Sequence, residues 1–510
     1  MNWPISHLYF KRTISFVSPK KKSSHLSLPP YRSFWPLYSA GESTLRASSR
    51  DMPRCDMISA LPEPLITKIL SYLPTKHSVT TSVLSTRWKS LWLSVPSLDI
   101  NCDDFPYGEE EVVLTFLDRF LEFNPDLRLL KVKVKCGNVE IEGLKERIST
   151  VIQRGPQHLD VEGCIYYIDP DAQLYPSVEY MPLDLYTSKT LVSLKLLSSG
   201  VEDPGFVCMP CLKSMTLVKS RFRDDVSLEK LVSGCPVLEE LTLVRARDSS
   251  FEDEVDSFMR VRSGSLKRFR VPRHGYWGNT RGKCTLEIDA PVLEHMTLGE
   301  GHYDSVVLKN LTSLFSVDLD IKFGGVKLRE FFVPEDSSER KNFGHLFLSG
   351  ISSVRHMIIS EKTVEALHLY SDVGLIPKFN NLSRLEAVFP SKLLQFLPVF
   401  LECCPNLKHL ILEVVYSTFI GDAFELANVP QCFLSTLECV ELKRIHDWEE
   451  EEMKVATYFL ENAAVLKKLT LSLTNYPRYV SDEEIFEEVN KVTKRSPTCQ
   501  IFVIGIYADE

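Results

Sequence analysis

The amino-acid sequence predicts an α/β chain in three parts. A short helical module is followed by a solenoid of repeats, in which helices cover a parallel sheet, and a C-terminal α/β element closes the solenoid. Three observations predict this order: apolar residues with a helical period between residues 61 and 92, a short apolar phrase that returns after residue 127, and a renewed alternation of strand and helix patterns after residue 429.

Composition limits the classes of function. The chain has 510 residues, of which 44% are hydrophobic, and a formal net charge of −9. Its length is that of about three domains. The negative charge argues against a nucleic-acid interface based on bulk electrostatics, because such interfaces are strongly positive. No apolar run approaches the roughly 18 residues that span a bilayer. We therefore expect a protein of the cytoplasm or the nucleus, with no nucleic-acid or membrane partner.

Residues 1–55 are expected to form a disordered leader. The first 50 residues hold eight Lys and Arg, eleven Ser and one acidic residue, whereas the rest has 51 Lys and Arg against 67 Asp and Glu, a net charge of −16. A basic, Ser-rich composition is typical of disordered extensions and also of organelle transit peptides. Import into an organelle through residues 1–50 is the less favoured alternative. Translation from Met52 or Met57 would leave this leader out of the natural protein.

The first patterned segment is the predicted helical module. One apolar series has the spacing of one face of a short helix, between prolines at its entry and Pro74 at its end: Leu65, Ile66, Ile69, Leu70 and Leu73. A second series again follows a helical period: Val79, Val83, Leu84, Trp88, Leu91 and Trp92. So small a module cannot cover this surface alone. Either a partner protein or the next domain of the same chain must cover it.

The same segment resembles the plant F-box. The resemblance is carried by Leu61-Pro62, by "ILSYLPTK" at 69–76 and by "SVLSTRWKSLW" at 82–92. It implies that residues 56–104 dock on the Skp-type adaptor of a cullin–RING ubiquitin ligase. The residues implied to meet the adaptor are Leu61, Pro62, Leu65, Ile69, Leu70 and Leu73. Four more would hold the module together and reach toward the adaptor's tail: Val83, Leu84, Trp88 and Trp92.

A phrase of three apolar residues, with two residues and then one residue between them, recurs through residues 112–428 and beyond. Its first residues are Leu127, Leu191, Leu212, Leu238, Leu266, Leu293, Leu314, Val354, Val364, Leu407, Leu437 and Leu466. Spacings from residue 191 are 21, 26, 28, 27 and 21, close to the 20–29 of leucine-rich repeats. Each phrase predicts a strand that is connected to a helix. Residues 112–123 and 392–403 are examples of the predicted helices. Because no unit can bury its own apolar face, we expect a curved stack with the sheet along one side.

The concave face of such a stack suits the binding of another protein. Outward positions beside the strand leucines include Glu240, Thr242, Val244, Thr297 and Glu441. Their mixture of polar and apolar types indicates no particular ligand chemistry. The sequence therefore leaves the protein target, and any small co-ligand, unidentified.

Residues 429–508 resemble a second plant element, the FBD domain. Its three blocks occur in order as "VPQCFLSTLECVELK", "YFLENAAVLKKLTL" and "KRSPTCQIFV". The pattern predicts strand, helix, strand, helix and strand, with a capping box at Ser481 and Glu484 and a final strand over 500–507. A terminal unit must cover the last exposed core of a solenoid. We expect this element to close the stack.

No motif predicts a catalytic residue, a metal or a cofactor. Cys208 and Cys211 have a metal-ligand spacing, but no second pair accompanies them, so reduced and mostly buried thiols are expected for the thirteen cysteines. The segment 275–285 fails the phosphate-loop pattern, because only three residues separate Gly278 from Gly282. It is expected to be a surface loop.

These observations favour a non-catalytic substrate-recognition subunit of an SCF-type ubiquitin ligase. The F-box would bind the adaptor, and the repeats would hold a protein target close to the recruited conjugating enzyme. The alternative is a leucine-rich-repeat interaction scaffold with no ligase role. An organelle-imported enzyme is a third class, which rests on the leader alone.

Overall fold

The computed structural model describes residues 58, 60–105, 110–123, 125–136, 143–163, 180–245, 257–272, 284–303, 305–323, 337–372, 375–416, 426, 428–445, 448, 450–474 and 481–505. Contacts divide the chain into two compact units, residues 1–134 and 135–510. The leader, residues 1–55, lies outside the described residues, as does most of the segment 275–285.

Unit 1 begins with two short helices, α2 (Glu63–Leu70) and α3 (Thr75–Thr80). A proline precedes each of them, at the position where a missing N–H costs nothing. The second apolar series, from Val79 to Trp92, does not lie on one helix. α3 ends at Thr80, and the chain continues in the 3₁₀ turns η1 (Thr81–Val83) and η2 (Leu91–Ser94) between loops. Ser and Thr are frequent in this segment, and their hydroxyls compete for the backbone bonds that a helix needs.

The rest of unit 1 is one strand, one turn, one helix and a second strand. These elements are β1 (Ser97–Asn101), η3 (Cys102–Asp104), α4 (Glu110–Phe123) and β2 (Lys131–Lys135). The helix α4 confirms the prediction over residues 112–123. β1 and β2 are neighbours in a sheet, and Lys133 Nζ lies 3.6 Å from Asp99 Oδ1 across them.

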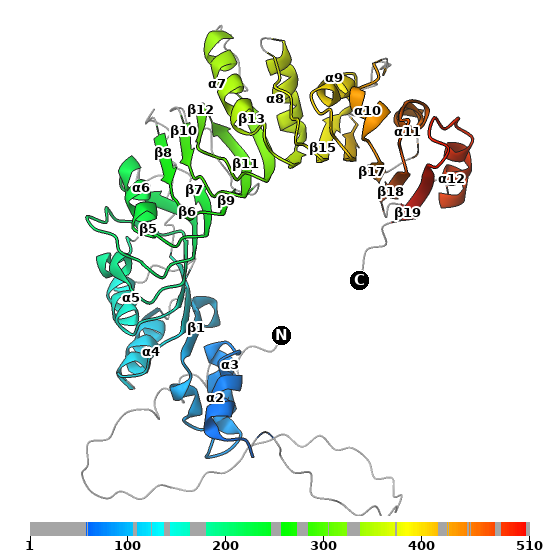
Figure 1. Cartoon of the computed structure of the whole chain (residues 1–510). Helices are drawn as coiled ribbons and strands as arrows, with labels where there is room; N and C mark the ends of the chain where they lie inside the picture. Colours follow the sequence, from blue (N-terminus) through cyan, green and yellow to red (C-terminus); the bar gives the residue numbers. More distant parts are fainter. Residues whose placement is uncertain are drawn as a thin grey trace, which may run out of the picture. The chain divides into compact units, whose positions relative to one another are not determined.

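Unit 2 is built on one long sheet whose strands pair in chain order and in parallel (Figure 1). Its strands are β3 (His158–Glu162), β4 (Ser193–Leu197), β6 (Ser214–Phe222), β7 (Glu240–Arg245), β9 (Arg268–Val271), β11 (His295–Tyr303), β13 (Ser316–Phe323), β14 (His356–Ile359), β15 (Arg384–Pro390), β16 (His409–Val415), β17 (Cys439–Ile445), β18 (Lys468–Leu473) and β19 (Gln500–Gly505). A short strand, β5 (Gly200–Val201), pairs with β6. This order confirms a solenoid in which each repeat contacts its neighbours.

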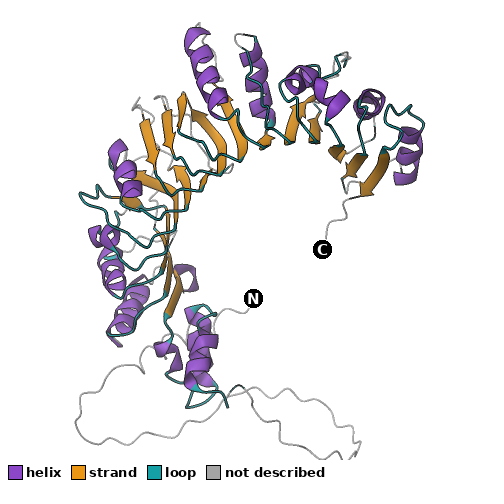
Figure 2. Ribbon diagram, in the orientation of Figure 1, coloured by secondary structure: helices purple, strands orange, loops and turns teal. Residues whose placement is uncertain are grey.

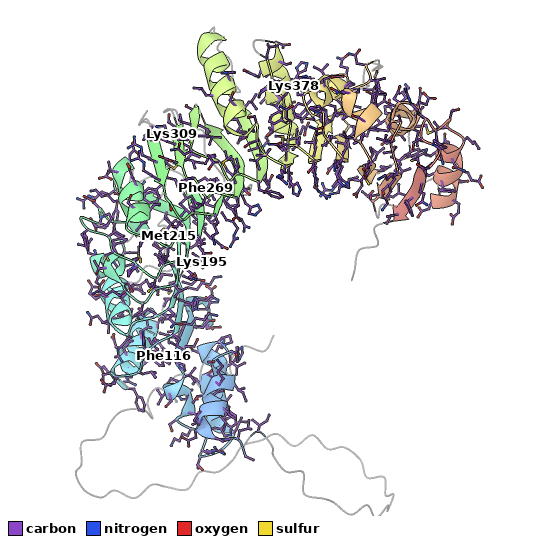
Figure 3. The ribbon with its side chains drawn as sticks, in the orientation of Figure 1. Phe116, Lys195, Met215, Phe269, Lys309 and Lys378 are labelled. Carbon is purple, nitrogen blue, oxygen red and sulfur yellow. The ribbon has the colours of Figure 1, made fainter. Side chains whose placement is uncertain are left out.

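The strand phrases supply the core of unit 2. Residues aligned across successive strands are buried, including Leu194, Met215, Leu241, Phe269 and Leu410, each at most 1% exposed. Met215 and Phe269 belong to these buried rows, whereas Lys195 of β4 is an outward position (Figure 3). Alternation along strands such as β4, β9 and β14 therefore separates a core face from a solvent face.

Helices cover the core face of this sheet along much of its length (Figure 2). They are α5 (Leu144–Gln153), η4 (Leu183–Thr187), α6 (Asp225–Ser233), α7 (Ser337–Gly350), α8 (Glu361–Ser371), η5 (Ser391–Leu393), α9 (Phe396–Glu402), α10 (Gln431–Ser435), α11 (Glu450–Asn462) and α12 (Asp482–Asn490). The capping box at Ser481 and Glu484 opens α12, as predicted. Among the described helices, none combines the length and the apolarity needed to cross a bilayer.

A second parallel sheet, β12-β10-β8, replaces helices on the outer side between α6 and α7 (Figure 1). It consists of β8 (Ser257–Arg262), β10 (Cys284–Asp289) and β12 (Ser305–Lys309). The sequence pattern did not predict it. β10 contains Thr285 and Ile288, and β12 contains Val306 and Val307, which are β-branched residues that favour extended chain over helix.

Other phrases were assigned to the wrong element. The phrase that starts at Val364 lies in α8, where Val364 and Leu367 share one buried helical face. β15 was missed, because Ala387 stands where the phrase expects a larger apolar residue. In the C-terminal region, β17, α11, β18, α12 and β19 follow the predicted order of strand, helix, strand, helix and strand.

Candidate functional site

Helix α2 has two apolar faces with different surroundings. Ile66 and Leu70 are 0% and 1% exposed and pack in a core cluster with Trp88, Leu91 and Val95. This core accounts for only part of the apolar residues in the module. The remaining apolar side chains of α2 are directed to solvent.

Large apolar side chains are exposed over α2 and the turns that follow. Their exposed fractions are 51% for Leu65, 44% for Ile69, 77% for Tyr72, 38% for Leu73, 57% for Val83 and 65% for Leu84. We call these six residues the exposed apolar set. Exposed apolar residues gathered on so small a module are typical of a protein-binding surface.

The ten predicted adaptor residues differ in exposure. Leu65, Ile69, Leu73, Val83 and Leu84 are exposed, together with Pro62, whereas Leu61 is half-buried and packs against the core cluster. Leu70, Trp88 and Trp92 are buried, at 1%, 5% and 5% exposure. The assignment of Leu70 as a contact residue is therefore corrected, because a core side chain offers no surface to a partner.

Tyr72 was missed by the sequence reasoning. It is the most exposed member of the set, and Lys68 Nζ lies 5.7 Å from the centre of its ring. Residues 65, 69, 72 and 73 have the spacing of one helical face. The helical period contained the signal, although it did not show which of the two apolar faces is the core.

Trp92 is covered by the same chain. Its ring lies 6.0 Å from that of Phe116 and 6.3 Å from that of Phe120, and both pairs are stacked. These phenylalanines belong to α4 of unit 1. Internal packing thus accounts for Trp92, and Trp88 belongs to the core cluster. Neither supports a direct adaptor contact.

The predicted concave-face residues are outward, with one exception. Glu240, Thr242, Thr297 and Glu441 are half-buried on outward positions of their strands, whereas Val244 is only 8% exposed and belongs to the core. The two carboxylates already have partners. Glu240 accepts hydrogen bonds from Arg268, and Glu441 accepts one from Ser472 at 3.0 Å. These side chains join neighbouring strands.

Cysteine chemistry offers no metal centre. Cys208 and Cys211 are free thiols, and no group of three potential ligands occurs among the residues that the structure describes. The expectation of reduced thiols is wrong for Cys102 and Cys136, which are disulfide-bonded. Burial raises the pKa of Cys235 to about 12, so this thiol is inert at physiological pH.

Comparison with known proteins matches three parts of the chain. The F-box domain matches residues 58–99, the repeats described as "FBD-associated F-box protein At5g56370, LRR repeats" match 153–311, and the FBD model matches 425–471. The FBD-associated F-box protein At5g27750 of Arabidopsis thaliana is 56% identical over 459 residues, which are 89% of this chain and 99% of that protein. The F-box/FBD/LRR-repeat protein At1g13780 of the same plant is 57% identical over 458 residues, 89% and 98% of the two chains.

The chain belongs to the plant F-box/FBD/LRR-repeat family.

This membership confirms the order F-box, leucine-rich repeats and FBD within an α/β fold. The F-box match at residues 58–99 contains the whole exposed apolar set. An F-box joined to leucine-rich repeats is in general the architecture of an SCF-type substrate receptor. Such proteins are typically non-catalytic, and the F-box implies a link to the ubiquitin pathway through a Skp-type adaptor.

Proposed function

We propose that this F-box/FBD/LRR-repeat protein is the substrate-recognition subunit of an SCF-type E3 ubiquitin ligase. The observation that carries the proposal is the exposed apolar set, beside a core cluster that is complete without it. Burial of these side chains by a Skp-type adaptor would remove a large apolar area from water, which is the main driving force of such association. Leu61 and Pro62 are proposed to lie at the edge of this contact.

The repeat sheet is proposed to hold the protein target. A receptor of this kind raises the rate of ubiquitin transfer by keeping lysines of the target close to the recruited conjugating enzyme. It needs no acid, base or nucleophile of its own. We place this activity in the cytoplasm or the nucleus, with organelle import as the alternative. The proposed parts are the F-box at 56–104, the repeats at 112–428 and the FBD element at 429–508.

Adaptor binding by the full chain tests the proposal. A double variant, Leu65→Asp with Ile69→Asp, should lose at least 100-fold in affinity for a plant Skp-type adaptor. Its melting temperature should change little, because both side chains are already about half exposed in the free chain. A charge at these positions becomes costly only when the partner excludes water.

Two further variants control this experiment. Val226→Asp changes an apolar side chain of α6 that is 50% exposed, outside the F-box, and should bind the adaptor like the wild type. Leu70→Asp should lose both binding and thermal stability, because Leu70 is core. Equal adaptor binding by the double variant and the wild type would overturn the assigned surface. A wild-type chain that binds no Skp-type adaptor would favour the interaction scaffold without a ligase role.

A further inference from the structure

The parallel register of unit 2 aligns five side chains on the outward face of the sheet. His295 of β11 pairs with Ser316 of β13, which pairs with His356 of β14. His356 pairs in turn with Arg384 of β15, and Arg384 pairs with His409 of β16. We call these five residues the histidine row. Because adjacent strands lie about 4.8 Å apart, the row is about 20 Å long.

The histidine row is open to solvent. Arg384 is exposed and the other four residues are half-buried, while the residue after each of them on its strand is buried. Arg355 and Lys408 directly precede two members of the row, and both are exposed. This stretch of sheet therefore gathers three permanent cations and three histidines.

Few carboxylates balance these cations. Glu294 lies 4.0 Å from His295 Nε2, and Glu438 next to β17 is held by Lys467 at 2.9 Å. Glu386, further along β15, is paired with Lys443 at 2.8 Å. Asp318 lies one outward position further along β13. Among the described residues, Arg384, His356 and His409 take part in no ion pair, and the Glu438 carboxylate acts on Lys408 and His409 only through longer-range attraction.

The ordinary ion pairs of the sheet show how unusual this is. On one side of the row, Arg268 of β9 is bonded to Glu240 of β7. On the other side, Arg444 at the end of β17 lies 3.1 Å from Glu413. Arg268 and Arg444 thus have acidic partners within the chain, which as a whole carries a net charge of −9.

Apolar surface lies beside the cations. The Phe315 ring lies between two histidines, with its centroid 6.1 Å from that of His295 and 4.6 Å from that of His356, both edge-on. Phe315 is 36% exposed, and Ile358, the next outward residue of β14, is 37% exposed. The surface combines positive charge with a small apolar platform.

The electrostatic environment of His356 reflects this excess of positive charge. Its pKa is lowered, first by partial burial and then by Arg384, His295, His409 and Arg355. Like charges close together disfavour further protonation. An anion placed among these groups would relieve that repulsion.

We propose that the histidine row is the part of the repeat sheet that recognises the protein target, and that it binds an acidic segment with an apolar side chain among its carboxylates. This inference rests on the proposed function and names its substrate class. An extended chain rises about 3.3 Å per residue, so about six residues would span the row. Charged groups on partners are arranged to complement one another, and Arg384, with Arg355 and Lys408 beside the row, favours carboxylates.

Fluorescence anisotropy with labelled peptides tests the inference on the full chain. The probe is an eight-residue peptide of Asp and Glu with a central Leu, and its control carries Asn and Gln instead. The acidic peptide should bind at least tenfold more tightly than the amide peptide, and the difference should shrink as salt screens the charges. Arg384→Glu should abolish the difference. Lys189→Glu, the same charge change at an exposed site away from the row, should preserve it.

The melting temperature of each variant shows whether that variant is still folded. If Arg384→Glu proves unstable, Arg384→Gln removes the charge at similar size and should still reduce the preference for the acidic peptide. Equal binding of acidic and amide peptides would overturn the inference. So would an Arg384 variant that is folded and keeps the preference. If inorganic phosphate displaces the peptide completely and binds as tightly as the peptide does, the histidine row is a small-anion site instead.

Adaptor binding measured on the same samples separates this inference from the proposed function. A chain that binds the adaptor without preferring the acidic peptide refutes the histidine row alone. A chain that prefers the acidic peptide without binding any Skp-type adaptor refutes the ligase role and leaves the recognition surface in place.

Discussion

The hydroxyl of Thr363 takes the place of a missing strand residue beside Ile321. Thr363 Oγ1 accepts a hydrogen bond from the Ile321 N–H at 3.0 Å and donates one to the Leu319 carbonyl at 3.0 Å. The pairing of β13 with β14 ends at Leu319 and Ile359, where the chain turns into α8. A buried side chain near the start of α8 therefore completes the edge of β13.

Thr363→Val should destabilise unit 2 by about 1–3 kcal/mol, because it leaves the buried Ile321 N–H without a partner at nearly unchanged volume. Thr363→Ser keeps the hydroxyl and should retain most of the stability. Urea unfolding followed by far-UV circular dichroism measures both. Equal losses in the two variants would assign the role to packing of the methyl group.

Gly344→Ala should destabilise the chain although the residue lies in a helix, α7. A methyl group there would lie 2.4 Å from ring carbons of Tyr370, whose side chain is 2% exposed and cannot move aside. Overpacking of this kind costs about 1–3 kcal/mol, which exceeds the helix-propensity gain of about 1 kcal/mol. Gly205→Ala, where no atom lies within 4 Å, is the control. A melting temperature for Gly344→Ala at or above that of the wild type would contradict the close contact.

Thiol reactivity should follow burial. In the native chain at pH 8, iodoacetamide should modify Cys211, which is exposed, and leave Cys235 and Cys432 unmodified. Burial raises the pKa of both buried thiols to about 12, so almost no thiolate is present. Mass spectrometry of tryptic peptides, with urea-unfolded protein as the reference, checks the pattern. Rapid native labelling of Cys432 would place it outside the core.

The stability of unit 2 should fall as the pH drops below about 6.5, and His356 should contribute to the loss. The folded-state pKa of His356 lies below its ordinary value, so the unfolded chain binds the proton more tightly. The cost begins near the ordinary pKa of 6.5 and is complete below the lowered one. His356→Gln should therefore lose less stability than the wild type between pH 7.5 and pH 5. Identical pH profiles would show that neither burial nor the neighbouring cations lower the pKa of His356.

Removal of residues 429–510 should destabilise the remaining repeats. The deletion takes away β17, which pairs with β16 from His409 to Glu413, and exposes the faces of Leu410 and Leu412. At about 25 cal/mol per Å² of apolar area, a few hundred Å² amounts to several kcal/mol. The truncated chain should aggregate or melt at a clearly lower temperature, yet still bind the adaptor. Unchanged melting with loss of one partner would instead make the FBD element a recognition domain.

Residues that repeat along the chain were the predictable part of this fold. Leu241 and Leu410 occupy equivalent phrase positions and are buried as expected. Periodicity alone could not show which face of α2 is the core, so Leu70 was placed outside and Tyr72 was overlooked. It also could not separate a strand phrase from two helical turns at Val364.

The histidine row was not visible in the sequence for a geometric reason. Its members are separated by unequal numbers of residues, because the returning segments between strands differ in length. Only the register of the sheet shows that His295, His356 and His409 share one line. Residues brought together by pairing of distant segments leave no local pattern to detect.

The alternation of buried and outward residues along strands such as β14 and β15 also bears on how such proteins can diverge. A buried phrase position is constrained by the repeats on both sides, since a change there disturbs packing. An outward position such as that of Arg384 carries no such constraint. Mutations can therefore change the outward side chains of one strand, while selection for folding acts on the buried side chains of the same strand. A duplicated gene of this kind can acquire a new target through single substitutions, each tested on an intact scaffold.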